Sequence, residues 1–380
     1  MAGRHVLQTL SRRALTVAAA AAGAGAGVAA AAAGGGDAPA GSCSSWYPAN
    51  NPVEDRFALH DGAAEGWRLF SVHDGHGGWQ MAEFSHKNLI PEVRKQYEQQ
   101  KTYVNYFIDR HREKKFDAHE SVEAVVQAAF ATVEQQYFSR VSEAFPLGFG
   151  ELAKVGSCVL LVMHKGSQLV VANCGDCRAV LGTRAEPKIG GGTENHRHYA
   201  TRLSHDHNSR VPLEALRLMR AHPGEKDIIV CKSSHACYVK GRLQLTRALG
   251  DGYLKYPELN APPNMHRSAG RHIAPPYTPP YVISRPEVTR VRLQPGDAFV
   301  VMATDGLWDE MGDSEAVAIV AKCVSEGRRQ DAAAALVDEA LRRAAEAAGM
   351  SVAELKALPP GGRRRNMHDD TTALVVWLDR

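Results

Sequence analysis

Residues 67–78 read WRLFSVHDGHGG, a short apolar run that ends in an aspartate and a glycine-rich turn. The run Trp67–His73 predicts a β-strand, and Asp74-Gly75-His76-Gly77-Gly78 predicts the turn that follows it. A carboxylate placed just after a rigid strand has a fixed direction. The neighbouring glycine leaves room beside it for a metal ion and its waters. The stretch therefore predicts a strand that delivers Asp74 to a functional site.

The same local pattern, an acidic residue at the edge of an apolar strand, recurs along the chain. It occurs at Glu54-Asp55, Asp74-Gly75, Asp176, Asp305-Gly306 and Asp369-Asp370. A single Asp-Gly pair is most often only a turn, but five such sites together predict a shared centre. Oxygen ligands without histidine or thiolate suit Mg²⁺ or Mn²⁺ better than Zn²⁺. Two such ions about 3.5–4 Å apart can activate water for attack on phosphorus.

Apolar runs and helical periodicity predict an α+β domain of mainly antiparallel sheets with flanking helices. The further strands are expected at Cys158–Met163, Gln168–Ala172, Cys177–Leu181, Ala298–Ala303 and Ala373–Leu378. The first two of these predict a hairpin, and the next a third strand in series. Helices are expected at Ser121–Val141, Asp313–Val324 and Asp331–Ala348. The last two are expected to be N-capped by their opening aspartates.

Composition is ordinary for a soluble globular protein, with 44% hydrophobic and 23% charged residues in 380. A formal net charge of +3 is too small to favour nucleic acid as a partner. Seven cysteines are an odd number and predict reduced thiols in a core rather than a disulfide framework. Zinc at Cys231 and Cys237 is disfavoured because no second Cys or His pair has suitable spacing.

The N-terminus is typical of a targeting segment. Residues 1–36 contain Arg4, Arg12 and Arg13 and no acidic residue, which favours a mitochondrial presequence. The run Ala14 to Gly36 leaves a secretory signal, plastid import or a weak anchor as alternatives. Because it is mostly Ala and Gly, no stable membrane insertion is expected. We assign residues 1–41 to a presequence and linker, and 42–380 to a single catalytic domain.

An ordered set of segments resembles the type-2C, metal-dependent protein phosphatases over residues 46–380. The segments are Val53-Glu54-Asp55-Arg56, Asp74-Gly75-His76-Gly77-Gly78, Gly156-Ser157-Cys158, Asn173 to Ala179, Leu203 to His207, Thr246 to Asp251, Asp305-Gly306-Leu307-Trp308-Asp309 and Asp369-Asp370-Thr371-Thr372. The resemblance implies a four-layer sandwich of two antiparallel β-sheets flanked by α-helices. It also implies hydrolysis of phosphoserine or phosphothreonine in a phosphoprotein by a metal-activated water.

The resemblance further implies a set of metal ligands for two Mg²⁺ or Mn²⁺ ions. Asp74 would bridge both ions, and the carbonyl of Gly75 would bind one of them. Asp305 and Asp369 would complete the second site. Asp176 would help Asp305 hold a weaker third ion.

Three catalytic roles follow from the same resemblance. Glu54 and Asp55 would act mostly through metal-bound waters, so Asp55 counts among the metal ligands as well. His76 would be the general acid that protonates the leaving serine or threonine oxygen. The alternative for His76 is a structural histidine in a glycine loop.

The chain departs from the family at one position that binds substrate. The family often has an arginine four residues before the Glu-Asp pair, where it clamps the substrate phosphate, and here that residue is Asn50. Arg56 is one possible replacement. The run Arg363-Arg364-Arg365 either attracts an acidic substrate surface or, more simply, forms a solvated basic loop.

Segments such as Pro48–Arg56 and Ala221-His222-Pro223 resemble the pyruvate dehydrogenase phosphatases. Together with the N-terminal segment they predict a mitochondrial enzyme, in the matrix, that acts on the pyruvate dehydrogenase complex. Two alternatives are a catalytically inactive phosphoprotein-binding regulator of the same fold and a small-molecule phosphohydrolase.

Overall fold

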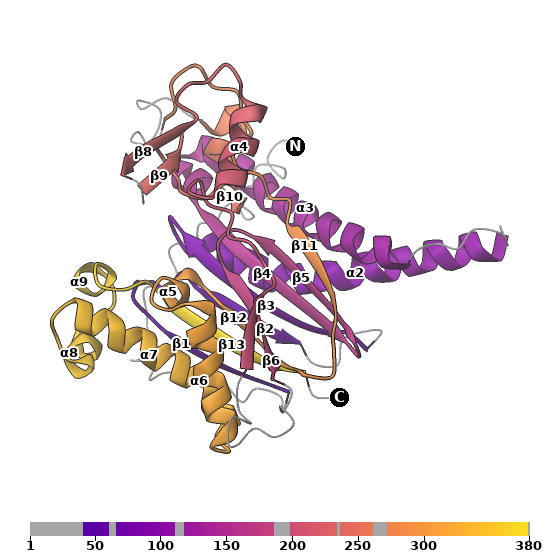
Figure 1. Ribbon diagram of the computed structural model, residues 1–380. Helices are drawn as coiled ribbons and strands as arrows, with labels where there is room; N and C mark the ends of the chain where they lie inside the picture. The colour runs from indigo at the N-terminus through magenta and orange to yellow at the C-terminus, as the bar shows by residue number, and fades with distance from the viewer. Residues whose placement is uncertain are drawn as a thin grey trace, which may run out of the picture.

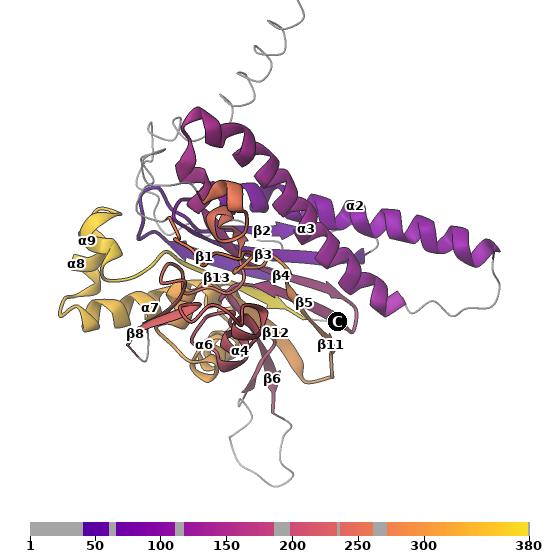
Figure 2. The same cartoon turned by 90° about the horizontal axis from the view of Figure 1, so that it is seen from above.

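The computed structural model describes residues 41–60, 66–110, 118–185, 198–233, 236–260 and 272–378. The predicted presequence and linker, apart from Gly41, lie outside them. Two β-sheets lie face to face between helices (Figures 1 and 2). None of the described helices is both long and apolar enough to cross a membrane.

The first sheet contains both ends of the described chain. Its five strands pair antiparallel in the order β1 (Ser42–Tyr47), β13 (Thr371–Trp377), β12 (Asp297–Ala303), β6 (Arg178–Arg184) and β7 (His198–Arg202). The second sheet has the order β11 (Glu287–Arg292), β5 (Gln168–Cys174), β4 (Gly156–Lys165), β3 (Arg68–His76) and β2 (Arg56–His60), with the short β10 (Leu249–Gly250) also paired to β4.

Successive side chains along each strand point to opposite faces of its sheet, so one set packs between the two sheets and the other packs against the helices. Along β12, Val300 and Met302 join the core between the sheets, whereas Phe299 and Val301 face the helices α6 (Asp313–Ser325) and α7 (Ala332–Ala347). The outer face of the second sheet packs against the helices α2 (Gln80–Arg110) and α3 (Ala118–Ala144). Figure 2 shows the two helix layers on opposite sides of the sheets. The predicted α+β four-layer sandwich is therefore confirmed.

The helices differ in length and in how well the sequence predicts them. Their bounds are α2 Gln80–Arg110, α3 Ala118–Ala144, α4 Pro212–Ala221, α5 Asp305–Trp308, α6 Asp313–Ser325, α7 Ala332–Ala347, α8 Val352–Ala357 and α9 Gly362–Arg365. Single 3₁₀ turns lie at Phe145–Leu147, Gly150–Lys154, Gly252–Leu254, Pro257–Leu259 and Arg329–Asp331. The long α2 was not predicted, because its sequence is polar and carries Pro91 in its interior.

Two local predictions are wrong. The strand expected at Cys177–Leu181 is present as β6, but it does not continue the sheet of β4 and β5, because the chain crosses to the other sheet after Gly175, whose φ of 128° turns the chain. The N-cap of α6 is Gly312 rather than Asp313, and the side chain of Glu315 accepts the Gly312 N–H at 2.8 Å. Asp331 does precede α7, but its side chain makes no capping hydrogen bond.

Apart from β10, which pairs with β4, the described residues between β7 and β11 form a small subdomain, which we call the flap. It contains α4 and the hairpin of β8 (Ile229–Ser233) and β9 (Ala236–Val239). Buried Lys240 holds it together, since its Nζ donates to Glu225 at 2.8 Å and to Asp227 at 2.7 Å. The flap lies beyond the ends of the central strands, above the two sheets in Figure 1.

The cysteines follow the prediction only in part. Five are free and buried, as expected for reduced core thiols: Cys43, Cys158, Cys174, Cys177 and Cys323. The other two, Cys231 and Cys237, occupy facing positions of β8 and β9 and form a disulfide. This pairing depends on the register of the hairpin, which the spacing alone did not reveal. It also leaves neither sulfur as a thiolate for zinc.

A buried ion pair between Lys255 and Glu134 provides a test of the packing. Lys255 Nζ also donates to the carbonyl of Ala248 at 2.7 Å, and Glu134 accepts the N–H of Gly250 at 2.9 Å. Lys255→Met would leave the Glu134 carboxylate buried without a cation. We expect a loss of about 3–5 kcal/mol in the free energy of unfolding, measured with urea.

The matched control is Lys356→Met, which removes the cation from the exposed pair with Asp338. Its expected loss is below about 1 kcal/mol because water screens the pair. Equal losses in the two variants would contradict the assignment of a tightly packed core around Glu134.

Candidate metal centre

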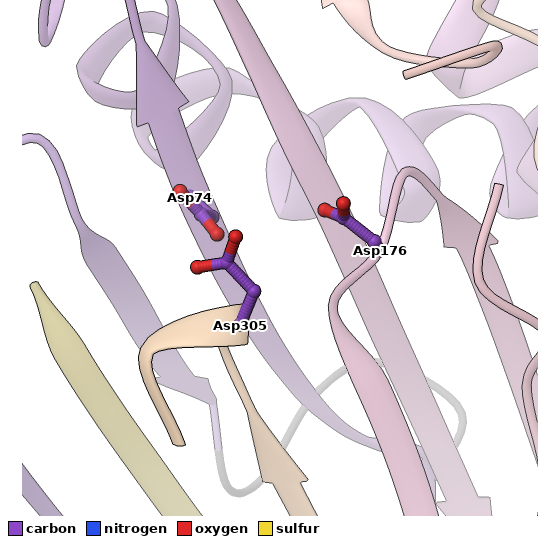
Figure 3. Close-up of side chains that lie close together, drawn as sticks. All are labelled: Asp74, Asp176 and Asp305. Carbon is purple, nitrogen blue, oxygen red and sulfur yellow. The ribbon is translucent and has the colours of Figure 1, made fainter. Parts of the chain in front are cut away.

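Strand ends from both sheets bring the acidic residues together. Asp74 lies near the end of β3, and Asp176 lies between β5 and β6. Asp305 begins α5, with only Thr304 between it and the end of β12. Each of these three offers a carboxylate oxygen, and the three oxygens lie within 4.8 Å of one another. Figure 3 shows the three side chains pointing toward a common space. Asp369, which lies two residues before the start of β13, lines the same cleft.

The cleft has a volume of about 710 Å³ and extends from the carboxylates to the flap. Most of the residues predicted for the site line it: Glu54, Asp74, Gly75, His76, Asp176, Asp305 and Asp369. At Gly75 a β-carbon would stand 2.7 Å from the carbonyl oxygen of Glu54. Glycine is therefore what lets the end of β3 lie against the segment that carries Glu54.

Asp55 is the exception, because it is not among the residues that line the cleft. Its side chain is buried, and its Oδ2 accepts hydroxyl hydrogen bonds from Thr304 at 3.0 Å and Thr372 at 2.7 Å. Burial, reinforced by the charge of Asp370, raises the pKa of Asp55 well above its usual value. The structure thus places Asp55 behind the cluster, and its role through metal-bound water stays a prediction.

Clustering makes the carboxylates repel one another. Burial, and then the charges of Asp305 and Asp55, raise the pKa of Asp74 well above its usual value. Burial followed by the charge of Asp176 does the same to the pKa of Asp305. A divalent cation would relieve this repulsion. The donors are carboxylate oxygens, which fit Mg²⁺ or Mn²⁺.

The thiol of Cys158 belongs to the support of this cluster. Its Sγ donates to Oδ1 of Asp176 at 3.1 Å. Burial, followed by the charge of Asp176, raises the pKa of Cys158 well above its usual value. The sulfur therefore stays a protonated donor, and the cluster offers oxygen ligands rather than a thiolate.

His76 is held by a carboxylate that the sequence did not single out. Its Nε2 lies 2.8 Å from Oδ2 of Asp251, whose side chain is fully buried. Burial tends to lower the pKa of His76, but the charge and hydrogen bond of Asp251, together with the charges of Asp176 and Glu54, outweigh burial, and the pKa is raised. Gly156 faces this pair so closely that a β-carbon there would overlap both atoms. The arrangement suits a protonated, oriented imidazole.

Asp370 is a second residue whose role was missed. Its Oδ1 accepts the backbone N–H groups of Ala49 at 2.6 Å and Asn50 at 2.8 Å, and its Oδ2 accepts that of Glu54 at 2.7 Å. The side chain of Asn50 donates to Asp370 at 3.1 Å and to Asp369 at 3.3 Å. The signal in the sequence was the doubled aspartate, of which only one was assigned to the metal.

Arg56 is poorly placed to replace the arginine that is missing at position 50. Its guanidinium donates to Glu83 at 2.6 Å and to the carbonyl oxygens of Val53 at 2.9 Å and Asp55 at 2.7 Å. It is not among the residues that line the cleft. Arg56 thus has a structural role at the start of β2.

Comparison with known proteins finds relatives of this chain. The family model described as Protein phosphatase 2C matches residues 49–349. "Probable protein phosphatase 2C 67" from Arabidopsis thaliana is 33% identical over 339 residues, covering 87% of this chain and 81% of the relative. "Probable protein phosphatase 2C 61" from Oryza sativa subsp. japonica is 34% identical over 332 residues, covering 87% and 79%.

A solved structure agrees with the fold. The crystal structure of serine-threonine phosphatase 2C from Toxoplasma gondii superposes with a TM-score of 0.56 at 20% sequence identity. The match covers 91% of this chain and 98% of that one. At this identity the likeness supports the fold alone.

The repulsion within the cluster predicts opposite effects with and without metal. In chelator, Asp305→Asn should raise the melting temperature by roughly 2–4 °C, as expected for about 1 kcal/mol of relieved repulsion. With Mn²⁺ at 100 times its Kd, the wild-type protein should gain about 2.7 kcal/mol of stability, which the variant should largely lose. Differential scanning calorimetry in the two buffers measures both effects.

The control is Asp338→Asn, at an exposed carboxylate on α7. It should leave both melting temperatures close to those of the wild-type protein. Mn²⁺ stabilisation of Asp305→Asn equal to that of the wild type would exclude Asp305 as a ligand.

Proposed function

The chain belongs to the protein phosphatase 2C family of metal-dependent serine/threonine protein phosphatases, and from that premise we propose a two-cation mechanism at the carboxylate cluster. The observation that carries it is the approach of the Asp74, Asp176 and Asp305 oxygens to within 4.8 Å. We assign two Mg²⁺ or Mn²⁺ ions to the ligands Asp74, the Gly75 carbonyl, Asp305 and Asp369. Asp176 would help Asp305 to hold a weaker third ion. Glu54 and Asp55 complete the shell through water.

When bound, the cations supply Lewis-acid activation of the phosphate and of a water molecule. The residues of the chain provide orientation and protons. His76 lines the cleft with a raised pKa, so it carries the proton that the leaving serine or threonine oxygen needs. Asp251 fixes the ring through Nε2. The other ring nitrogen, Nδ1, makes no hydrogen bond to a described residue and is the atom that can serve the leaving oxygen.

The role of Asp251 predicts a dependence on the leaving group. Asp251→Asn should lower kcat/KM for a phosphothreonine peptide by about 100-fold or more, because an alkoxide needs a proton to leave. For p-nitrophenyl phosphate, whose leaving group needs no proton, the loss should stay within about tenfold. Steady-state kinetics with both substrates measure the difference.

His76→Asn should show the same pattern, and the double variant should lose little more than either single one. Equal losses on the two substrates would mean that Asp251 only stabilises the fold. A folded, metal-loaded wild type without activity would favour the phosphoprotein-binding regulator. Efficient turnover of metabolite phosphates would favour the small-molecule enzyme.

For the physiological setting we propose the mitochondrial matrix, with the pyruvate dehydrogenase complex as the substrate. Two features of the sequence support this. The first 36 residues are basic and free of acidic side chains, and segments such as Pro48–Arg56 resemble the pyruvate dehydrogenase phosphatases. The names of the relatives above specify no substrate.

Residues 1–45 fused to a fluorescent reporter should direct it to mitochondria, as imaging would show. Replacing Arg12 and Arg13 with glutamate should abolish this import, since a presequence needs its positive charge. Fluorescence in the secretory pathway or in plastids would contradict the proposed mitochondrial localisation. The full chain should also dephosphorylate pyruvate dehydrogenase faster than an unrelated phosphothreonine protein, and equal rates would contradict the substrate.

A further inference from the structure

We propose that Arg365 supplies the guanidinium that binds the substrate phosphate, in place of the arginine missing at Asn50. The proposal rests on the phosphatase function given above. It concerns a residue that lies 315 positions away in the sequence, at the end of the short helix α9.

Asp369 connects the two positions in space. Its Oδ1 accepts the side-chain amide of Asn50 at 3.3 Å, and its Oδ2 accepts Nη2 of Arg365 at 2.6 Å. The amide and the guanidinium therefore flank one carboxylate at the edge of the metal cluster. Arg365 thus places a positive charge beside the position that the family fills with arginine.

Arg365 also lines two adjoining spaces. One is the cleft that contains the carboxylate cluster, and the other is a hollow of about 400 Å³ whose wall includes Asn50, Glu54 and Trp79. Its side chain remains 45% exposed, so the guanidinium is accessible from the cleft. Among the described residues it makes one ion pair, through Nη2, which leaves further N–H donors for an anion.

The neighbouring residues hold Arg365 in this place. The N–H of Gly361 donates to the carbonyl of Ala49 at 2.6 Å. The buried Arg364 donates to the carbonyl oxygens of Pro48 at 3.0 Å, Lys356 at 2.8 Å and Leu358. The predicted solvated basic loop is thus wrong for Arg364. Arg364 fastens α9 to the segment just before Asn50 and so fixes the backbone position of Arg365.

The other arginines of the cleft are less suited to the role. Arg178 donates to Asp206 at 2.6 Å and to Asp313 at 2.9 Å, so both ends of its guanidinium are engaged. Arg210 and Arg242 line the cleft but do not line the hollow beside Asn50. Among the arginines that line the described cleft, Arg365 alone borders both spaces.

The chemistry of a guanidinium matches this task. Its planar fork binds two oxygens of a phosphate at once, whereas lysine offers a single point charge. Arg365→Ala should therefore weaken binding of inorganic phosphate, and raise KM for a phosphothreonine peptide, by about 10- to 100-fold. Arg365→Lys should recover part of the loss, and kcat should change much less than KM.

The experiment uses the full chain and a control from the same helix. Arg363 is exposed on α9, and Arg363→Ala should leave phosphate binding unchanged. Isothermal calorimetry measures the affinity for inorganic phosphate in Mg²⁺, and a separate titration measures the affinity for Mg²⁺ itself. Steady-state kinetics give KM and kcat, and thermal melting confirms that each variant folds.

The expected result is weaker phosphate binding in Arg365→Ala with Mg²⁺ affinity and melting temperature retained. Unchanged phosphate affinity and KM would overturn the proposal. A joint loss of Mg²⁺ affinity and stability would overturn it too, because Arg365 would then only position Asp369. A wild type without hydrolysis would instead refute the proposed function, while its calorimetric phosphate affinity would still test Arg365.

Discussion

The site depends on one buried carboxylate, that of Asp370. Its two oxygens accept the backbone N–H groups of Ala49, Asn50 and Glu54, together with the side-chain amide of Asn50. These bonds fasten the segment between β1 and β2 to the start of β13. Since β1 also pairs with β13 along its whole length, the segments next to these strands are held together, and they bring Glu54, Arg365 and Asp369 to the cleft. Hydrogen bonds to a charged acceptor are strong enough to fix such a segment.

A rigid frame of this kind can force like charges together. The core between the sheets and the two helix layers fix the strand ends, so Asp74 and Asp305 cannot move apart to relieve their repulsion. The free energy of this conflict is offset by apolar burial elsewhere in the domain. Binding a cation relieves the repulsion between the carboxylates. The rigid site is therefore selective for a cation that prefers oxygen ligands. Perturbed carboxylates in a cleft are a usual mark of a functional site.

The residue pattern of short stretches of the sequence predicted the features that interactions within those stretches determine. The strands at Cys158–Met163 and Ala298–Ala303 and the position of Asp74 follow from apolar runs and glycine, and the structure contains β4, β12 and the end of β3 there. Long-range contacts escaped prediction. The bond from His76 to Asp251 spans 175 positions, and no periodicity reports such a contact. The burial of Asp55 against two threonine hydroxyls is set by packing of strands from separate parts of the chain.

The asparagine at position 50 belongs to a site that can obtain its positive charge from elsewhere in the chain. A phosphate dianion requires positive charge at a place in space, and any part of the chain that reaches that place can provide it. Asn50 donates to both Asp369 and Asp370 without adding charge. An arginine at position 50 would instead bring a second guanidinium toward Arg365, and like charges at such short range repel. One arginine is sufficient there, so the change at Asn50 is compatible with an active enzyme rather than a sign of lost activity.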